Sequence, residues 1–317
     1  MRYSLAFIAA ITATAQAHGV ITEIQGANGV NMPGLSVQDG TPRDCPTPGC
    51  GAEADTSIIR TREMGGKASA LGRTNGGGPV DAAAAISKFM GAGAASGAST
   101  AATGSTTSTG SSATTGKKGG NAAVVAAAAN AARGILGDLL GGGKGGADSA
   151  GGATSAGTKT AKGTSEEGVA ASAGKGATSG LPTTGDDGSI TMTFHQVNQD
   201  GAGPLTAAID ATSGGTDPSA FKEATVMQNV PGIGIGGLSR ATTTDFPVKV
   251  QMPAGMTCQG TVGGASNVCI VRMQNSALAG PFGGSAAFTQ STAAKKRAVE
   301  YNLRKRHFAR GLFGKPE

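Results

Sequence analysis

Apolar and polar residues alternate along several short stretches in the second half of the chain. In residues 189–197, with sequence SITMTFHQV, Ile190, Met192 and Phe194 fall on one side of an extended chain and His195 falls on the other. A period of two residues is typical of a strand that buries one face. The pattern therefore predicts a strand whose apolar face packs in a core and whose histidine points away from it.

Three further stretches support the same fold class. Residues 246–252 (FPVKVQM) alternate again, residues 267–273 (NVCIVRM) are rich in β-branched side chains, and Val20–Ile24 predicts a strand near the N-terminus. Turns rich in Gly and Pro separate these stretches at about the spacing of a β-sandwich. No convincing amphipathic helix lies between the strands of the second block. We therefore predict an all-β fold.

A long stretch without such alternation divides the patterned regions. Glycine accounts for 55 of the 317 residues, and residues 91–180 contain no aromatic residue, Cys, His or Pro. A segment made mainly of Gly, Ala, Ser and Thr cannot bury enough apolar surface to offset a backbone ordering entropy of about 1–2 kcal/mol per residue. This composition predicts a disordered insert and excludes a compact enzyme of 300 residues, such as a barrel or a dinucleotide-binding dehydrogenase.

The chain is therefore expected to contain one folded domain in two parts. We assign a signal peptide to residues 1–17, the first part of the β-sandwich to 18–90, and the low-complexity insert to 91–185. The second part of the β-sandwich follows at 186–294, and a basic tail at 295–317. The two sandwich parts together are long enough for a single domain with a sizeable core.

The N-terminal segment has the pattern of a secretory leader. Arg2 precedes a short apolar run, and the sequence Ala15-Gln16-Ala17 is a small-x-small cleavage site. The apolar run is too short to cross a bilayer, so we expect no transmembrane segment. Cleavage after Ala17 makes His18 the first residue of a secreted, extracellular protein.

The four cysteines, Cys45, Cys50, Cys258 and Cys269, fit this compartment. In an oxidising environment they indicate two disulfides, for which three pairings are possible. A zinc site is the competing interpretation, but the sequence lacks Cys-x-x-Cys pairs and has no histidine near the cysteines. We favour disulfides and leave their pairing open.

The positive charge is confined to the C-terminal tail. Residues 295–317 contain eight lysines and arginines against two glutamates, which accounts for the whole net charge of +6. Nucleic-acid proteins carry such charge as a patch on the folded domain, so we expect no nucleic-acid partner. The pairs Lys296-Arg297 and Lys305-Arg306 suggest either a tail trimmed at dibasic sites or a solvated tail that stays attached; an amphipathic membrane helix is a third possibility.

The positions of the histidines indicate a metal. Removal of the leader leaves only His18, His195 and His307. An N-terminal histidine offers its α-amine and its Nδ1 to one metal ion, and a second imidazole completes a T-shaped set of three nitrogens. Nitrogen-rich planar coordination suits copper. We predict a copper site formed by His18 and His195, against the alternative that His195 is an ordinary strand histidine.

Several long motifs resemble one fungal family. The chain is similar to the appressorium-associated secreted virulence proteins of the Gas/Mas type, a resemblance that covers nearly all of both sandwich parts. It rests on HGVITEIQGANGVNMPGLSV, DGTPRDC, ADTSIIR, ALGRTNGGGPVDA, HQVNQDGAGPLTAAID, NVPGIGIGGLS, DFPVKVQMPAGMTC and NVCIVRMQNSALAGPFGGSAAFTQ. The resemblance implies secretion by a fungus and a part in host penetration.

A more distant resemblance is to lytic polysaccharide monooxygenases, copper enzymes built on an immunoglobulin-like sandwich. It implies an immunoglobulin-like β-sandwich here, with His18 and His195 as the metal ligands of a histidine brace. It also implies an axial aromatic residue, for which Phe288 is the first choice and Phe282 the second, and a polar residue near the oxygen species, for which we choose Gln290. The chain departs from such enzymes in lacking Trp and in having only two Tyr.

Two functions are open at this stage. In the first, a copper enzyme oxidatively cleaves a cell-wall polysaccharide. In the second, a non-catalytic secreted protein binds copper or interacts with a host surface. Both imply an extracellular protein whose partner is a wall polymer or a surface, and we expect a monomer.

Overall fold

The computed structural model describes residues 18–92, 153–154, 156–233 and 238–312. The chain divides into two units, of which one comprises Met1–Gly97 and Gly151–Glu317 and the other Ala98–Ala150. The second unit lies entirely outside the described residues, as does the predicted signal peptide. All described residues belong to the first unit.

Strands dominate this unit, as the sequence predicts. The strands are β1 (Gly19–Gln25), β2 (Asn31–Pro33), β3 (Ser57–Ile58), β4 (Arg73–Thr74), β5 (Gly78–Pro79), β6 (Ala153–Thr154), β7 (Thr158–Lys159), β8 (Ser189–Gln196), β9 (Thr206–Asp210), β10 (Phe221–Asn229), β11 (Thr244–Gln251), β12 (Gly260–Val262), β13 (Ala265–Gln274) and β14 (Phe282–Thr289). The helices are α1 (Ala82–Phe89), α2 (Gly168–Ser172), α3 (Gly176–Ser179) and α4 (Thr292–Leu312).

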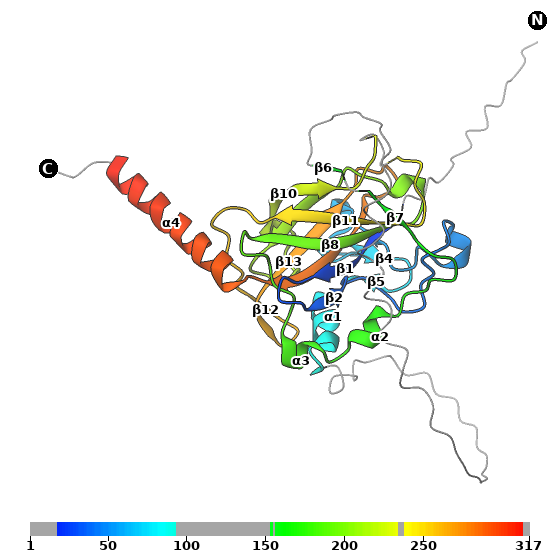
Figure 1. Ribbon diagram of the computed structural model, residues 1–317, viewed down its shortest axis with the longest axis horizontal. Coiled ribbons are helices and arrows are strands. Elements are labelled where there is room, and N and C mark those ends of the chain that lie inside the picture. Colours follow the sequence, from blue (N-terminus) through cyan, green and yellow to red (C-terminus); the bar gives the residue numbers. More distant parts are fainter. Residues whose placement is uncertain (1–17, 93–152, 155, 234–237, 313–317) are drawn as a thin grey trace, which may run out of the picture. The chain divides into compact units, whose positions relative to one another are not determined.

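Within the described ranges, these strands form one continuous, mainly antiparallel sheet. Its order is β2-β1-β8-β11-β10-β9-β13-β14-β3-β4-β5, with β12 beside β13, β7 beside β11, and β6 parallel to β10. In Figure 1, β8, β11 and β10 lie side by side as neighbouring ribbons.

The strand β10 turns this sheet into a sandwich. Its first residues, Phe221–Ala224, pair with β9, and its later residues, from Thr225, pair with β11 with a register shift between Val226 and Gln228. Such bulges bend a strand and increase its twist. The two halves of the sheet then face each other, and β14 crosses β1 so closely that a Cβ on Gly284 would lie 2.7 Å from the backbone nitrogen of Ile21. Only glycine allows this approach.

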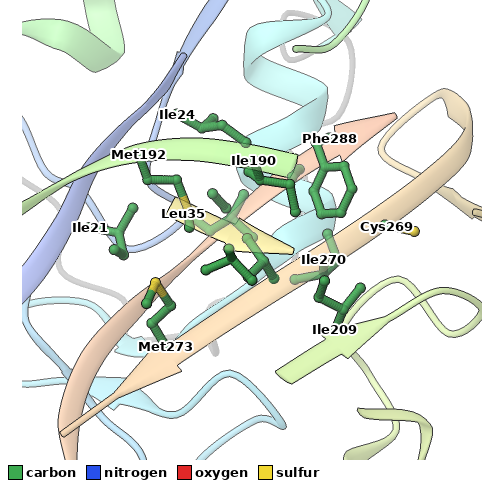
Figure 2. Packing of buried hydrophobic residues seen from close by; sticks show 14 of the residues in the cluster. Ile21, Ile24, Leu35, Ile190, Met192, Ile209, Cys269, Ile270, Met273 and Phe288 are labelled. Carbon is green, nitrogen blue, oxygen red and sulfur yellow. The ribbon is translucent and has the colours of Figure 1, made fainter. Parts of the chain in front are cut away.

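The core fills the space between these halves. The apolar face of β8 contributes Ile190, Met192 and Phe194, as its alternation predicts. Figure 2 shows Ile190 and Met192 packed with Ile270, Phe288 and other side chains from the opposite half. The all-β sandwich predicted from the sequence is confirmed.

The cysteines form two local disulfides. Cys45 bonds to Cys50, and Cys258 bonds to Cys269. The second bond ties the segment before β12 to β13, where Cys269 is fully buried in the core. The prediction of disulfides is confirmed, and the pairing that the sequence left open is 45–50 with 258–269.

The end of the insert differs from the expectation. Residues 156–185, placed in the disordered insert by composition, pack on the domain. Thr158–Lys159 pairs with β11, Thr164 accepts a hydrogen bond from the backbone N–H of Arg43, and Leu181 is buried in the core. Backbone pairing with the sheet and side-chain charge stabilise a segment that has few apolar residues. The predicted boundary at 185 is therefore too late by about thirty residues.

A charged network joins this segment to the first block, with Arg43 and Asp55 buried and Glu166 partly buried. The guanidinium of Arg43 binds both carboxylate oxygens of Asp55, at 3.0 and 2.6 Å, and one oxygen of Glu166 at 2.9 Å. Burial lowers the pKa of Arg43, but the two carboxylates outweigh it and raise that pKa above its usual value. This ion network fastens Glu166 to the domain.

The boundary predicted between residues 294 and 295 falls inside a helix, because α4 begins at Thr292 and includes most of the basic tail. The N-terminal half of the helix is attached to the domain: Asn302 donates a hydrogen bond to the carbonyl of Gly255, and Arg297 donates one to the carbonyl of Asp186. Figure 1 shows α4 as one long helix at the C-terminal end of the chain. None of the helices in the described part of the chain is long and apolar enough to cross a membrane.

The Arg43 network gives a stability prediction. Arg43→Ala leaves the buried carboxylate of Asp55 and the partly buried carboxylate of Glu166 without their cation, and breaking a buried pair costs about 3–5 kcal/mol. Denaturant unfolding should show this loss in the free energy of unfolding. The control Arg62→Ala, at an exposed arginine, should change the free energy of unfolding by less than about 0.5 kcal/mol. Equal stability of the two variants would contradict the account.

Candidate functional site

The pairing of β1 with β8 brings the two predicted copper ligands to neighbouring strands. Val20 lies opposite His195, and Gly19 lies opposite Gln196. One step further, the carbonyl of His18 accepts a hydrogen bond from the backbone N–H of Val197 at 3.0 Å. In an antiparallel pair, this register makes His18 and His195 diagonal neighbours.

Glycines on both sides of His18 make this position possible. A Cβ on Gly19 would collide with the ring of Phe194, and a Cβ on Gly201 would collide with the carbonyl oxygen of His18. The start of β1 therefore lies against the sheet with no room for side chains at these two positions. The local sequence His-Gly is suited to a histidine that must sit at the very beginning of a buried strand.

The ring of His18 occupies a buried polar pocket. Its Nδ1 lies 3.0 Å from an oxygen of Glu53 but without the alignment of a hydrogen bond, and its backbone N–H donates to Asn198 Oδ1 at 3.0 Å. The amide of Asn198 in turn donates to the same Glu53 oxygen at 3.1 Å. The ring packs on Phe282, with 4.7 Å between the ring centroids.

The ring of His195 is oriented by a carboxylate. Its Nδ1 lies 2.7 Å from Asp245 Oδ1, on the strand that flanks β8 on its other side. An ionised carboxylate only accepts hydrogen bonds, so Nδ1 carries the proton in the neutral ring and Nε2 keeps its lone pair. Histidines that bind metals are commonly oriented by a carboxylate in this way. The ring lies on the strand face opposite the core, as predicted, and it is fully buried.

Two of the three nitrogen atoms that a histidine brace requires make no hydrogen bond, whereas the third, the backbone nitrogen of His18, donates to Asn198. In the part of the chain that the structure describes, His18 Nδ1 and His195 Nε2 are buried and neither makes a hydrogen bond. Buried polar atoms are normally satisfied, so two unsatisfied imidazole nitrogens on adjacent strands need an explanation. The donor set fits the group: the third nitrogen, the amine of His18, exists only after removal of the leader.

The described residues do not form a metal site made of side chains alone. Among the residues that the structure describes, no three His, Cys, Asp or Glu side chains gather into a group that could hold a metal ion. A brace contains only two side chains and a terminal amine, so this observation bears on other kinds of site.

The structure does not bring the other two predicted site residues to the histidines. Phe288 is fully buried in the core opposite Cys269, and Gln290 hydrogen-bonds the backbone of Met256 and Cys258. Phe288 lies near the far end of β14, about 20 Å along the strand from Phe282 at 3.3–3.4 Å per residue, and Gln290 follows the last residue of the strand. The aromatic residue beside His18 is Phe282, the second choice of the sequence analysis, because β14 crosses β1 at its first residues rather than its last.

Three residues of the site were not found from the sequence. Glu53 and Asn198 surround His18, and Asp245 orients His195, yet these residues are separated from their partners by 35, 180 and 50 positions. No spacing motif joins residues so far apart. The one signal was Asp245 itself, a charged residue just before the apolar alternation of 246–252.

Comparison with known proteins agrees with the family resemblance. The model of the Egh16-like virulence factor family matches residues 16–283, which include both histidines. The chain belongs to this family. The resemblance to fungal appressorium-associated virulence proteins, stated above on sequence motifs, is thereby confirmed.

Two named relatives come from Pyricularia oryzae. The chain is 58% identical over 319 residues to appressoria-specific virulence factor GAS2, a match that covers 98% of this chain and 97% of the relative. It is 38% identical over 131 residues to appressoria-specific virulence factor GAS1, covering 40% of this chain and 51% of that protein. No solved structure matches the chain.

The Asp245 contact gives a test of the site in metal-free protein. Nitrogen-15 NMR should show His195 with its proton on Nδ1. Asp245→Asn should shift the population toward the Nε2-protonated tautomer, because an amide can present a donor to Nδ1 where the carboxylate could only accept. His307, exposed in α4, serves as an internal control and should be unaffected. An Nε2–H tautomer in the unmodified protein would contradict the assigned orientation.

Proposed function

We propose that the mature chain is a secreted, virulence-associated protein that binds one copper ion through His18 and His195. Membership of the Egh16-like virulence factor family and similarity to two appressoria-specific virulence factors support the role in infection. A signal-peptide pattern at residues 1–17 and two disulfides support secretion.

The observation that carries the copper proposal is the pair of unsatisfied imidazole nitrogens on adjacent strands. His18 would contribute Nδ1 and its free amine, and His195 would contribute Nε2. The α-amine titrates near 8, so it loses its proton to a metal at mild pH. Three nitrogens in this arrangement favour Cu(II), which also heads the affinity series of divalent metals.

The surroundings of the nitrogens define what the protein itself contributes. Asp245 holds the His195 ring in the tautomer that presents Nε2. Glu53 places a carboxylate beside His18 Nδ1, where its negative charge would stabilise a bound cation. Phe282 covers the His18 ring and limits its movement. These residues orient two ligands before the metal arrives.

Burial favours a copper-binding role over direct attack on a polymer. His18 is 2% exposed and His195 is 0% exposed, whereas a site that oxidises an insoluble polysaccharide must reach the surface. The large exposed aromatic residues among those the structure describes, Tyr301 and Phe308, lie in α4 and not on a strand of the sandwich. A non-catalytic, secreted copper-binding protein is therefore the function that this geometry supports best.

Oxidative cleavage of a cell-wall polysaccharide is the second candidate. It is favoured by the donor set, an N-terminal histidine with a second histidine oriented by a carboxylate. Bound copper would supply one-electron chemistry toward oxygen or peroxide.

Processing decides whether the amine donor exists. N-terminal sequencing of the secreted protein should give His-Gly-Val-Ile, because cleavage after Ala17 exposes His18. Any other first residue would remove the chelating amine and contradict the copper proposal.

Metal binding should follow the two ligands. Purified mature protein should bind one Cu(II) with an axial type-2 electron paramagnetic resonance spectrum and nitrogen hyperfine coupling. His195→Ala and a version with an added Met before His18 should each weaken binding by orders of magnitude, because each removes or displaces a ligand nitrogen. His307→Ala is the matched control and should bind as the unmodified protein does. Unchanged copper binding in the first two variants would overturn the proposal.

The two candidate functions differ in one measurable product. Copper-loaded protein with ascorbate should release no oxidised oligosaccharides from a panel of wall polymers, as mass spectrometry would show, if the buried site only binds copper. Release that disappears in His195→Ala would establish the second candidate instead.

A further inference from the structure

A separate polar cleft lies on the outer face of β1 and β8. Residues 156–185, called the covering segment below, lie over it. Its volume is about 290 Å³, near the lower end of small-molecule sites. The strands contribute Thr22, Glu23 and Thr193, β11 contributes Asp245, and the covering segment contributes Thr160 and Glu166. Hydroxyl groups and carboxylates therefore converge on one small space.

The charge of this cleft is negative. Its one arginine, Arg43, is neutralised by Asp55 and Glu166, which leaves the carboxylates of Glu23 and Asp245 without an ion-paired Lys or Arg in the described structure. Burial raises the pKa of Glu23, and Glu166 adds to that rise; hydrogen bonds from Gln25 and Asn31 and the charge of Lys175 oppose it. A positively charged ligand would relieve the cost of holding this carboxylate in a half-buried place.

The cleft also has unused hydrogen-bonding capacity. In the described structure, the hydroxyl oxygen of Thr160 is buried and has no hydrogen-bond partner. A buried hydroxyl without a partner costs free energy unless a ligand completes it. The Thr160 hydroxyl therefore indicates that the covering segment, and not only the strands, contributes to a binding site.

The lining narrows the chemistry of the ligand. The described residues contain no group of three or more acidic or metal-binding side chains arranged to hold a metal ion, which argues against a bare cation. No aromatic residue lines the cleft, so an apolar or stacked ligand has no platform. A small ligand with several hydroxyl groups and one positive charge fits the cleft, because the charge complements the carboxylates and the ligand hydroxyls can hydrogen-bond the hydroxyls of the lining.

We propose that this cleft binds a sugar unit bearing a free ammonium group, with Glu23 facing the ammonium and Thr160 bonding a sugar hydroxyl. The site is distinct from the pair of histidine nitrogens proposed to bind copper. The two sites share one residue, Asp245. One of its carboxylate oxygens contacts the ring of His195, and the residue also lines the cleft.

The test uses the mature protein with a metal chelator, so that its outcome does not depend on copper. Isothermal titration calorimetry compares a β-1,4-linked glucosamine dimer, its N-acetylated counterpart and spermidine. We expect binding of the glucosamine dimer, with at least tenfold weaker binding of the other two. The acetylated dimer lacks the charge, and spermidine lacks the hydroxyls.

Two variants then test the assigned contacts. Glu23→Gln keeps an acceptor for Gln25 and Asn31 but removes the charge, and it should weaken binding of the glucosamine dimer by about 10- to 100-fold. Thr160→Val should weaken it about 2- to 10-fold while leaving the melting temperature equal or higher, because it removes an unsatisfied hydroxyl. Glu223→Gln, at an exposed glutamate on β10, is the matched control and should bind normally.

Three results would overturn the proposal. No binding of the glucosamine dimer would show that the cleft is not such a site. Equal binding of spermidine or of the acetylated dimer would show that its chemistry is wrong. Unchanged binding in Glu23→Gln would place the ligand elsewhere. A protein that binds the dimer but not copper would refute the copper site alone, and the reverse would refute this inference alone.

Discussion

The antiparallel pairing of β1 with β8 is the interaction on which the rest of the site depends. It carries the predicted mature N-terminus into the sheet, so that the backbone of His18 is hydrogen-bonded at the level of Val197. Because β8 also pairs with β11, the same strand places His195 beside Asp245. A leader that remained attached would keep the same register but leave the His18 nitrogen as an amide, which is a poor metal ligand. Proteolysis and strand pairing together would thus make the proposed site.

A second constraint is that the covering segment, residues 156–185, packs on the outer face of the sheet. This segment has few apolar side chains, and it is held by backbone pairing with β11 and by the partly buried contact of Glu166 with Arg43. Because the covering segment is polar, its carboxylates and hydroxyls and those of the strands line a small cleft between them. The segment is too polar to join the core. For the same reason, the space beneath it suits a polar ligand.

The sequence was sufficient for the parts of the fold that depend on local pattern. Period-two alternation identified β8 and β11, and the apolar face of β8 is the one that packs in the core. Composition failed at residues 156–185 and at the boundary before the tail, because pairing with a distant strand and contacts with Gly255 and Asp186 are long-range interactions. The same limit applies to the site. His18 and His195 were found from chemistry, whereas Glu53 was not found, and the choice of Phe282 over Phe288 depends on how β14 crosses β1.

The central claim is that one copper ion lies between two imidazoles on adjacent strands. The most direct measurement is an anomalous difference map at the copper absorption edge, from crystals of the mature secreted protein with one equivalent of Cu(II). The account predicts a single strong peak within bonding distance of His18 Nδ1, the His18 amine and His195 Nε2. A peak at His307 or at any other site, with the His18 and His195 nitrogens free of metal, would contradict it.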